Sequence, residues 1–434
     1  MTGLSMTTAV AAAWSVSSTR FGEPSRGRAR EALLMLPILS FYAILLALTL
    51  ALEPWVRRLG VPLGVVLVLL GFVGSEMWVA TGGDTGLHWQ WFHDLIVHLL
   101  LPILIFEGAY NLAPRQLLRN LLPILTLALP VMLLCTAVTA ALLYLGIGHP
   151  AGFPWLAALI AGALLSATDP TAVLEVLRRT GAPLRLQLLL DGEGLFNDAN
   201  AIVLFTFLVA LATGDRAWAR WDESALAMVG VLIGGAVVGL AVGALAVRLG
   251  RALDRPVERG VLTLITAYGG FALAIQLGVS GVVAVLCVGL LFGQHRRRAP
   301  DDEALSVLWA YKAWLANRLL FLIAGITVQL VMFTDQWLAI LIGIGATLVG
   351  RAAAVLLLLP LTVRLPGTER LPGTWYPLLW WGGTRGVVTL ALALSLPVEL
   401  PYWWTIQSIA YGVVLWTLLV QAMSMPLVLR WLRP

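Results

Sequence analysis

The chain contains 434 residues, of which 60% are hydrophobic and only 12% are charged, whereas a soluble domain of this size carries about 25% charged residues. This composition excludes an ordinary soluble globular protein. The net charge of +5 comes from basic residues scattered through short loops, so we expect no nucleic-acid partner. The two cysteines, Cys135 and Cys287, lie in apolar runs without disulfide or metal-ligand spacing, and we expect no cofactor.

Apolar runs of roughly twenty residues recur from Leu33 onward, and each is long enough to cross a hydrocarbon layer of ~30 Å. Because backbone polar groups in lipid must be satisfied within the protein, and the runs lack strand-like alternation, the pattern predicts a helix bundle rather than a barrel. We predict an all-α polytopic membrane protein with a mobile tail at residues 1–30 and about thirteen transmembrane helices. Their predicted limits are 32–52, 61–80, 93–112, 121–146, 154–177, 186–213, 226–247, 257–277, 279–294, 305–331, 336–362, 374–397 and 403–431.

Loop charge predicts the orientation of these spans. When the loops are assigned alternately to two sides, eighteen arginines fall on one side and six on the other. Cytoplasmic loops carry the excess of basic residues, so we expect the C-terminus in the cytoplasm and the N-terminus outside. The composition, rich in Ala, Leu and Arg, is typical of a GC-rich bacterium. For a helix bundle from such a source we expect the bacterial cytoplasmic (inner) membrane.

Several predicted spans carry ionisable side chains. Such groups cost a few kcal/mol in a membrane even on lenient scales, so they are candidates for function. The alternative is a purely structural role, in which all of them form ion pairs between helices. We favour that interpretation for Glu193 and Arg351 but not for Asp169 and Asp198. The full set is Glu107, Asp169, Asp191, Glu193, Asp198, Lys312, Arg318, Arg351 and Arg385.

The fifth predicted span contains a helix break. Pro170 lacks an amide donor and disfavours the α conformation at Asp169. A break at membrane depth is tolerated only beside a cavity or inside protein. It frees carbonyl groups at the end of the first half-helix, which favour a cation, and Thr168 and Asp169 add side-chain oxygens at the same depth.

The twelfth predicted span contains a second break at 382–386, where three glycines occur in five residues. We expect Arg385 to neutralise the carbonyl end of the half-helix that precedes it. The two breaks are seven spans apart, so spans 1–6 and 8–13 are candidate inverted repeats. Paired interrupted helices in corresponding positions indicate a transporter site.

The sixth predicted span places its acids by helical spacing. Gly194 and Asp198 are one turn apart, as are Glu193 and Asn197, so we expect Glu193 to support Asn197 while Asp198 points towards the fifth-span break. Desolvation favours the neutral form of a carboxyl group, and a bound cation favours the ionised form. One acid that holds either a proton or a cation is the minimum machinery for exchange.

Four stretches resemble bacterial NhaP-type and eukaryotic sodium/proton exchangers. Residues 101–112 (LPILIFEGAYNL) resemble the third-span signature, and 167–173 (ATDPTAV) with 191–199 (DGEGLFNDA) resemble the fifth- and sixth-span core. Residues 382–394 (GGTRGVVTLALAL) resemble the twelfth-span signature. The tenth-span pattern is matched by Trp309, Asn317 and Phe321.

The resemblance implies a homodimer that carries out electroneutral exchange of one Na⁺, with Li⁺ as a further candidate, for one H⁺ by elevator-type movement, and a role in pH homeostasis. It implies dimerisation-domain spans 1–3 at 31–112 and 7–10 at 214–331, and core (transport) spans 4–6 at 113–213 and 11–13 at 332–434.

The resemblance also assigns roles to residues. Asp198 would carry the ion and the proton, Thr168 would be a direct ligand, and Asp169 and Glu107 would be water-linked or gating carboxylates. The expected Na⁺ ligands are therefore Asp198, Thr168 and Asp169. The residues expected to fix the sixth helix and the crossing of the two breaks are Glu193, Asn197, Arg351 and Arg385.

Two positions depart from the family pattern. Gly194 stands where many members have Ser, so either water replaces that ligand or the preference shifts towards a larger ion such as potassium. Arg318 stands where members often have a small polar residue; for it we expect packing or snorkelling, and we assign no role to Lys312.

Three other functions remain to be distinguished from sodium/proton exchange. The first is potassium/proton exchange on the same fold, which ion-gradient assays in vesicles would separate. The second is an intramembrane aspartyl protease using Asp169 and Asp198, but the Gly-x-Gly-Asp arrangement of such enzymes is absent from the spans; we therefore expect a transporter and not an enzyme. The third is a channel. A carboxylate site disfavours it, because the bound cation would leave the site too slowly for conduction.

Overall fold

The computed structural model describes residues 26–59, 62–81, 95–112, 114–147, 153–214, 221–295, 300–362 and 370–432. Every regular element among them is a helix, as predicted. Residues 1–25, which form most of the predicted mobile tail, lie outside the described residues. Eight helices or helix series in the described part of the chain are long and apolar enough to cross a membrane, and shorter apolar helices occur at Tyr42–Val56, Leu95–Asn111 and Gly281–Gln294.

Each of the thirteen predicted ranges holds a helix or a series of helices. The first half comprises α2 (Arg26–Leu59), α3 (Leu63–Ala80), η1 (Leu95–Leu100), α5 (Leu101–Asn111), α6 (Pro114–Arg119), α7 (Leu121–Thr126), η2 (Leu127–Val131), α8 (Met132–Gly146), α9 (Trp155–Ser166), α10 (Thr171–Arg179) and α11 (Leu184–Ala212). The second half comprises α12 (Trp221–Gly250), α13 (Pro256–Gln276), α14 (Gly281–Gln294), α15 (Pro300–Thr327), α16 (Leu330–Asp335), α17 (Trp337–Thr362), α18 (Trp375–Trp381), α19 (Val387–Leu394), α20 (Trp403–Trp416), η4 (Thr417–Ala422) and α21 (Met423–Leu432).

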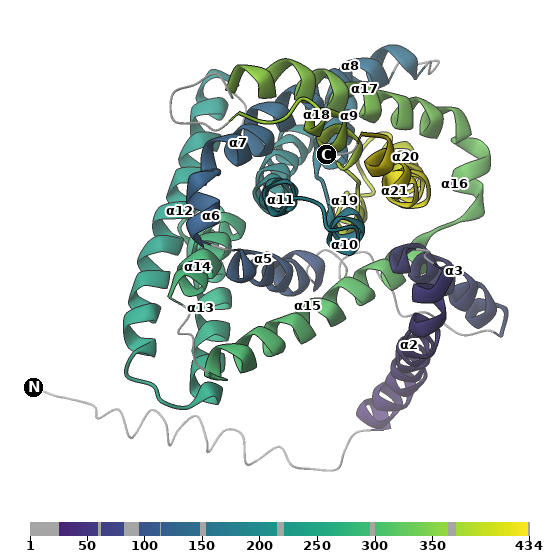
Figure 1. The fold of residues 1–434 in the computed structure, drawn as a ribbon. Helices are drawn as coiled ribbons and strands as arrows, with labels where there is room; N and C mark the ends of the chain where they lie inside the picture. The colour runs from purple at the N-terminus through teal and green to yellow at the C-terminus, as the bar shows by residue number, and fades with distance from the viewer. Residues whose placement is uncertain are drawn as a thin grey trace, which may run out of the picture.

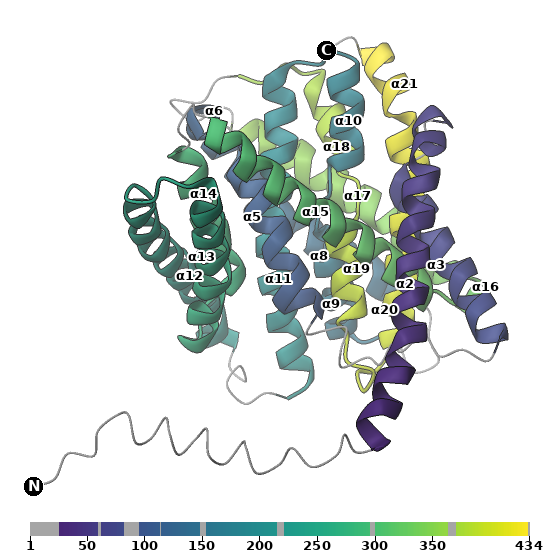
Figure 2. The ribbon, with the colours of Figure 1, turned by 90° about the horizontal axis from the view of Figure 1, so that it is seen from below.

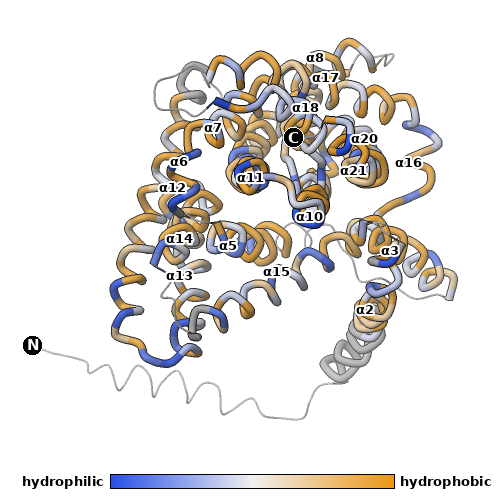
Figure 3. Tube along the Cα trace, viewed as in Figure 1, coloured by the Kyte–Doolittle hydropathy of each residue, from blue (hydrophilic) through white to orange (hydrophobic). Residues whose placement is uncertain are grey.

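The helices form two groups in space. Helices α12–α14 lie on one side and α2–α3 on the opposite side, with α5 and the long α15 running between them (Figures 1 and 2). Helices α7–α11 and α17–α21 gather against this row (Figure 1). Hydrophobic residues cover most of the helices, and hydrophilic ones collect at α10 and at several helix ends (Figure 3), as expected for a bundle in lipid.

In the part of the chain that the structure describes, three helices contain short π-helical segments, and a proline explains each of them. Pro130 lies inside η2, Pro102 lies in the first turn of α5 directly after η1, and Pro426 lies four residues after the end of η4. A proline removes one backbone donor and its ring collides with the carbonyl four residues earlier. Widening the helix by one residue relieves that collision.

The first helix differs from its predicted limits. Helix α2 runs from Arg26 to Leu59, whereas the hydropathy pattern placed the first span at 32–52. At the C-terminal end, the reason is that Glu53 and the arginines after it interrupt the apolar run without interrupting the helix. At the N-terminal end, residues 26–30 were predicted to belong to the mobile tail, and that prediction is wrong because they lie in α2. Glu53 therefore lies within a helix, at a position that hydropathy assigns to a loop.

Candidate ion-binding site

Two helices are interrupted near the centre of the second group. Helix α9 ends at Ser166 and α10 begins at Thr171, while α18 ends at Trp381 and α19 begins at Val387. Pro170 accounts for the first gap, because it cannot donate to the helix and pushes Asp169 out of the α region. The glycines at 382–386 account for the second, because they lack the side chains that favour helix over coil.

The two interruptions bind each other through Asp169 and Thr384. The Asp169 amide donates to the Thr384 carbonyl at 2.8 Å, and the Thr384 hydroxyl donates back to the Asp169 carbonyl at 2.5 Å. A Cβ on Gly386 would collide with the Asp169 carboxylate. The glycine at this position therefore allows the two chains to approach so closely.

The Asp169 carboxylate sits at the N-terminal ends of two half-helices. Its Oδ1 accepts from the Thr171 amide at 3.0 Å and from the Thr171 hydroxyl, and its Oδ2 accepts from the Val387 amide at 3.4 Å. Helices α10 and α19 thus both direct unpaired N–H groups at one carboxylate. This is the arrangement in which a negative charge is stabilised by helix dipoles.

Asn197 on α11 holds the other side of the first interruption. Its amide nitrogen donates to the Ser166 carbonyl at 2.9 Å and to the Thr168 hydroxyl at 3.0 Å. The sequence-based expectation that Glu193 supports Asn197 is wrong for this structure, because both amide hydrogens are used by the interrupted helix. The Asn197 Oδ1 is buried and has no hydrogen-bond partner among the described residues.

Asp198 faces the interruption. Gly194, one turn earlier on α11, lies against Pro170 and the Thr168 carbonyl, so the face of α11 that carries both Gly194 and Asp198 is turned towards the broken helix. The Asp198 Oδ1 is buried without a hydrogen-bond partner in the described part of the chain. Its carboxylate lies within electrostatic range of three charged side chains, Asp169, Arg385 and Glu193.

Gly194 also explains how α11 comes so near. A Cβ at this position would lie 2.6 Å from Pro170 Cδ and 3.0 Å from the Thr168 carbonyl oxygen. Real Cβ atoms essentially never approach other heavy atoms as closely as the first of these distances. The missing side chain is therefore a packing requirement of this structure as well as a missing oxygen.

Glu193 and Arg351 form a buried ion pair between α11 and α17. Arg351 reaches Glu193 with both terminal nitrogens, and its Nη2 also donates to the Leu379 carbonyl at 2.9 Å. The role expected of Arg385, to bind the carbonyl end of the half-helix before it, is thus filled by Arg351. The Arg385 side chain is fully buried; its backbone is held by Thr417, and its Nη2 lies 3.9 Å from the Cys135 sulfur.

Comparison with known proteins decides the family. A family model described as "Sodium/hydrogen exchanger, transmembrane" matches residues 43–431. The chain belongs to this family. It is 34% identical over 346 residues to the Na(+)/H(+) antiporter ApNhaP of Aphanothece halophytica, a match that covers 78% of this chain and 64% of the relative. It is 35% identical over 351 residues to the Na(+)/H(+) antiporter NhaP of Pseudomonas aeruginosa, covering 78% and 81% of the two chains.

The fold of this exchanger-family chain also has a solved counterpart. The sodium proton antiporter MjNhaP1 of Methanocaldococcus jannaschii, at pH 8, superposes with a TM-score of 0.74 at 18% identity, over 89% of this chain and 99% of that one. The chain spans less than two thirds of the length of ApNhaP, 64%. The likeness to MjNhaP1 establishes the fold alone.

A cavity of about 380 Å³ reaches the candidate site of the exchanger-family chain. It is lined by Asp169 and Thr171 on one side and by Glu53, Asn317 and Arg318 on the other. Glu107 does not line it; the Glu107 carboxylate accepts a hydrogen bond from Asn111 one turn later on α5, at 2.6 Å. The structure therefore brings Thr168, Asp169, Gly194, Asn197 and Asp198 together around the first interruption, and among these residues the cavity is lined by Asp169.

Three contacts escaped the sequence analysis. Glu53 pairs with Arg318, the Thr384 hydroxyl donates to the Asp169 carbonyl, and the Asn197 amide donates to the Ser166 carbonyl. A signal existed for the first: an acid directly after one predicted span and an unexplained arginine inside another form a candidate pair. Thr384 belongs to the glycine-rich stretch of the twelfth predicted span, but its partner Asp169 is distant in sequence.

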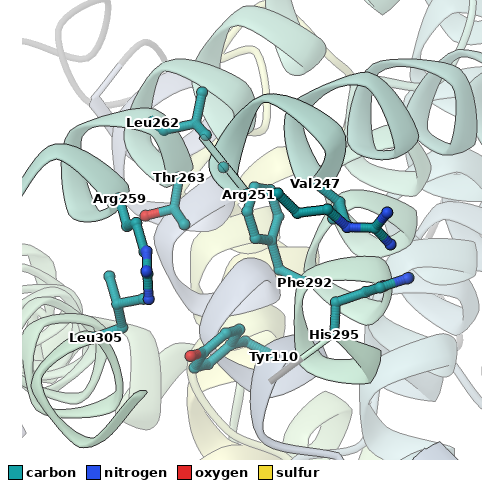
Figure 4. A pocket seen from close by; sticks show the side chains of 10 residues that line it. Tyr110, Val247, Arg251, Arg259, Leu262, Thr263, Phe292, His295 and Leu305 are labelled. Atoms are coloured by element: carbon teal, nitrogen blue, oxygen red, sulfur yellow. The ribbon is translucent and has the colours of Figure 1, made fainter. Parts of the chain in front are cut away.

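A second cavity of about 240 Å³ lies apart from the site. Arg251 and His295 stand on one side of it and Arg259 stands across from them, with Tyr110 below (Figure 4). The residues of the two helix interruptions do not line this cavity. It is separate from the ion-binding region.

Proposed function

We propose that this chain exchanges Na⁺ for H⁺ across the membrane, with both ions competing for Asp198. The observation that carries the proposal is a membrane-depth carboxylate with a buried, unpartnered Oδ1 beside an interrupted helix. An acid removed from water binds a proton readily, and a bound cation stabilises its ionised form. Because one carboxylate holds one ion at a time, the exchange is electroneutral, one Na⁺ or Li⁺ for one H⁺.

The cation ligands proposed here are grouped around Asp198. Thr168 supplies its hydroxyl oxygen, which already accepts one hydrogen bond from Asn197 and has a second lone pair. The unpartnered Oδ1 of Asn197 adds a further oxygen at this depth. Asp169 acts through water, since both of its carboxylate oxygens accept backbone hydrogen bonds. Glu107 stays assigned as a gating carboxylate.

Alternating access follows from movement of one helix group against the other. We assign thirteen transmembrane spans in inverted repeats, with core spans at 113–213 and 332–434 and dimerisation spans at 31–112 and 214–331. The large cavity supports this division, because Asp169 and Thr171 come from the first set and Glu53 and Arg318 from the second. The moving core carries Asp198 past the static wall, as an elevator.

The proposed setting is a bacterial inner membrane, with the N-terminus outside and the C-terminus in the cytoplasm. Arg179, on the side that loop charge assigns to the cytoplasm, lines the cavity. The conformation is therefore inward-facing on this proposal. We further propose a homodimer that serves pH homeostasis.

The test is cation-driven dissipation of a pH gradient in proteoliposomes. Asp198→Asn should abolish exchange, since an amide neither takes up a proton nor balances a cation, while membrane insertion and thermal unfolding stay close to those of the wild type. Asp254→Asn, an exposed acid between α12 and α13, is the matched control and should exchange normally. Full activity in Asp198→Asn would refute the assignment.

Potassium/proton exchange is the second candidate. Gly194 favours it, because the position one turn before Asp198 offers no side-chain oxygen to hold a small cation tightly. The same vesicles tested with sodium, lithium and potassium separate the two candidates. Proton flux with potassium and none with sodium would change the assignment to potassium/proton exchange. Family membership favours a transporter over an aspartyl protease.

A further inference from the structure

An ion pair that joins α2 to α15 lies in the wall of the large cavity. Arg318 Nη2 and Glu53 Oε2 are 2.9 Å apart, and the two side chains are only 9% and 14% exposed. The Arg318 guanidinium also stacks over the Trp314 ring, with its carbon 3.5 Å from the ring centroid. A guanidinium over an aromatic ring is a favourable cation–π contact, and this contact holds the Arg318 guanidinium independently of Glu53.

This pair shares the cavity with Asp169, at the entrance to the candidate ion-binding site. A second pair, Glu175–Arg179, lines the same cavity, but its side chains are 60% and 58% exposed. Charges in a buried wall act through a low dielectric and are poorly screened by salt, whereas exposed charges are strongly screened. A cation passing through the cavity therefore experiences the buried pair far more than the exposed one.

We propose that Glu53 and Arg318 set the electrostatic potential along the route of the cation to Asp198, an inference that rests on the proposed function. Arg318 is a fixed positive charge that repels the cation, and Glu53 neutralises it. Removing the Glu53 charge leaves Arg318 beside Trp314, so the potential in the cavity becomes more positive. Removing the Arg318 charge leaves Glu53 ionised in the wall, so the potential becomes more negative and attracts cations more strongly. The pair thereby acts on apparent affinity without binding the transported ion.

The experiment measures the KM for sodium in proteoliposomes for single and double variants. Glu53→Gln should raise the KM about 3- to 10-fold, and Arg318→Gln should lower it by a similar factor. The double variant Glu53→Gln with Arg318→Gln should return towards the wild-type value. Glu175→Gln is the matched control, and its KM should change less than about twofold because its charge is screened.

One additional variant and further measurements distinguish an electrostatic effect from simple misfolding. Arg318→Lys keeps the charge and should retain the wild-type KM. The shifts in the charge-removing variants should largely persist when inert salt is added, because charges in a buried wall are poorly screened. A purely structural role predicts lower unfolding temperatures and lower maximal rates in both single variants, with KM unchanged or moved in one direction. That result overturns the inference.

Failure of the proposed function gives a different result. If the wild type transports potassium instead of sodium, the opposed shifts should appear in the KM for potassium, so the inference stands while the ion assignment falls. If the wild type exchanges sodium and the two single variants do not shift in opposite directions, the inference falls while the proposed function stands. A wild type that exchanges no cation for protons overturns both.

Discussion

Gly194 offers the sharpest test of the packing around the candidate site. Replacing it with Ser would place a hydroxyl one turn from Asp198, where a side-chain oxygen is missing. The same change introduces a Cβ 2.6 Å from Pro170 Cδ and 3.1 Å from Pro170 Cγ. A proline ring has no alternative rotamer to move into, and its neighbour Asp169 is tied to Thr384. The packing effect should therefore dominate over the new oxygen.

The size of the effect follows from this contact. Adding atoms to a well-packed interior costs about 1–3 kcal/mol, and the rigidity of the contacted ring places Gly194→Ser in the upper part, about 2–3 kcal/mol. That corresponds to roughly 30- to 140-fold in the population of this packed arrangement. We expect lower exchange rates and a lower unfolding temperature for Gly194→Ser, measured by dissipation of a pH gradient with sodium, lithium and potassium and by thermal unfolding in detergent.

Two further variants separate packing from chemistry. Gly194→Ala adds the same Cβ without the hydroxyl, so it should lose about as much exchange as Gly194→Ser. Gly345→Ala on α17 is the control: no heavy atom lies within 4 Å of the position that its Cβ would take, so it should be tolerated. Wild-type stability and exchange in Gly194→Ala would refute the packing argument, and a gain of sodium affinity in Gly194→Ser alone would favour the missing-ligand interpretation.

Three more predictions address the surroundings of the site. Glu193→Gln should lower the free energy of unfolding by about 3–5 kcal/mol, because it leaves Arg351 charged, buried and poorly compensated; thermal unfolding checks this, and an unchanged transition would contradict it. Thr384→Val removes the hydroxyl that donates to the Asp169 carbonyl and should cost about 1–3 kcal/mol, with Thr384→Ser retaining stability. Tenfold more sodium should move the acidic limb of the pH–rate profile down by about one pH unit, as competition for one site requires; a limb that stays in place speaks against a shared carboxylate.

The positions of the helices were predictable because hydropathy reports them directly. In lipid a helix needs a long apolar run and a backbone satisfied within itself, so all thirteen predicted ranges hold helices. The interruptions at Pro170 and around Gly386 could also be predicted from the sequence, since proline and glycine destabilise a helix through the local backbone. The end of α2 could not be predicted in this way, because the helix continues through Glu53 although the apolar run ends there.

The partners of the polar side chains were much less predictable. Helical spacing showed that Glu193 and Asn197 share a face of α11, but it does not report which other helix faces them. In the structure, Glu193 meets Arg351 on α17 and Asn197 meets the end of α9. Burial removes water as an alternative partner, so each side chain takes the strongest group that tertiary packing brings near, and that group is distant in sequence.

The buried charges of the candidate site offer a physical reason for the proposed one-for-one exchange. Glu193 and Arg351 neutralise each other, and Asp169 is held at the N-terminal ends of α10 and α19, which leaves Asp198 as the carboxylate with an unsatisfied buried oxygen. With either a proton or a monovalent cation on Asp198, the moving core carries the same net charge. With neither, it carries one more negative charge, which is costly to move through a low-dielectric region. On the proposed mechanism, both loaded states thus cross with similar electrostatic cost and the empty state is held back, so that proton and cation fluxes stay coupled.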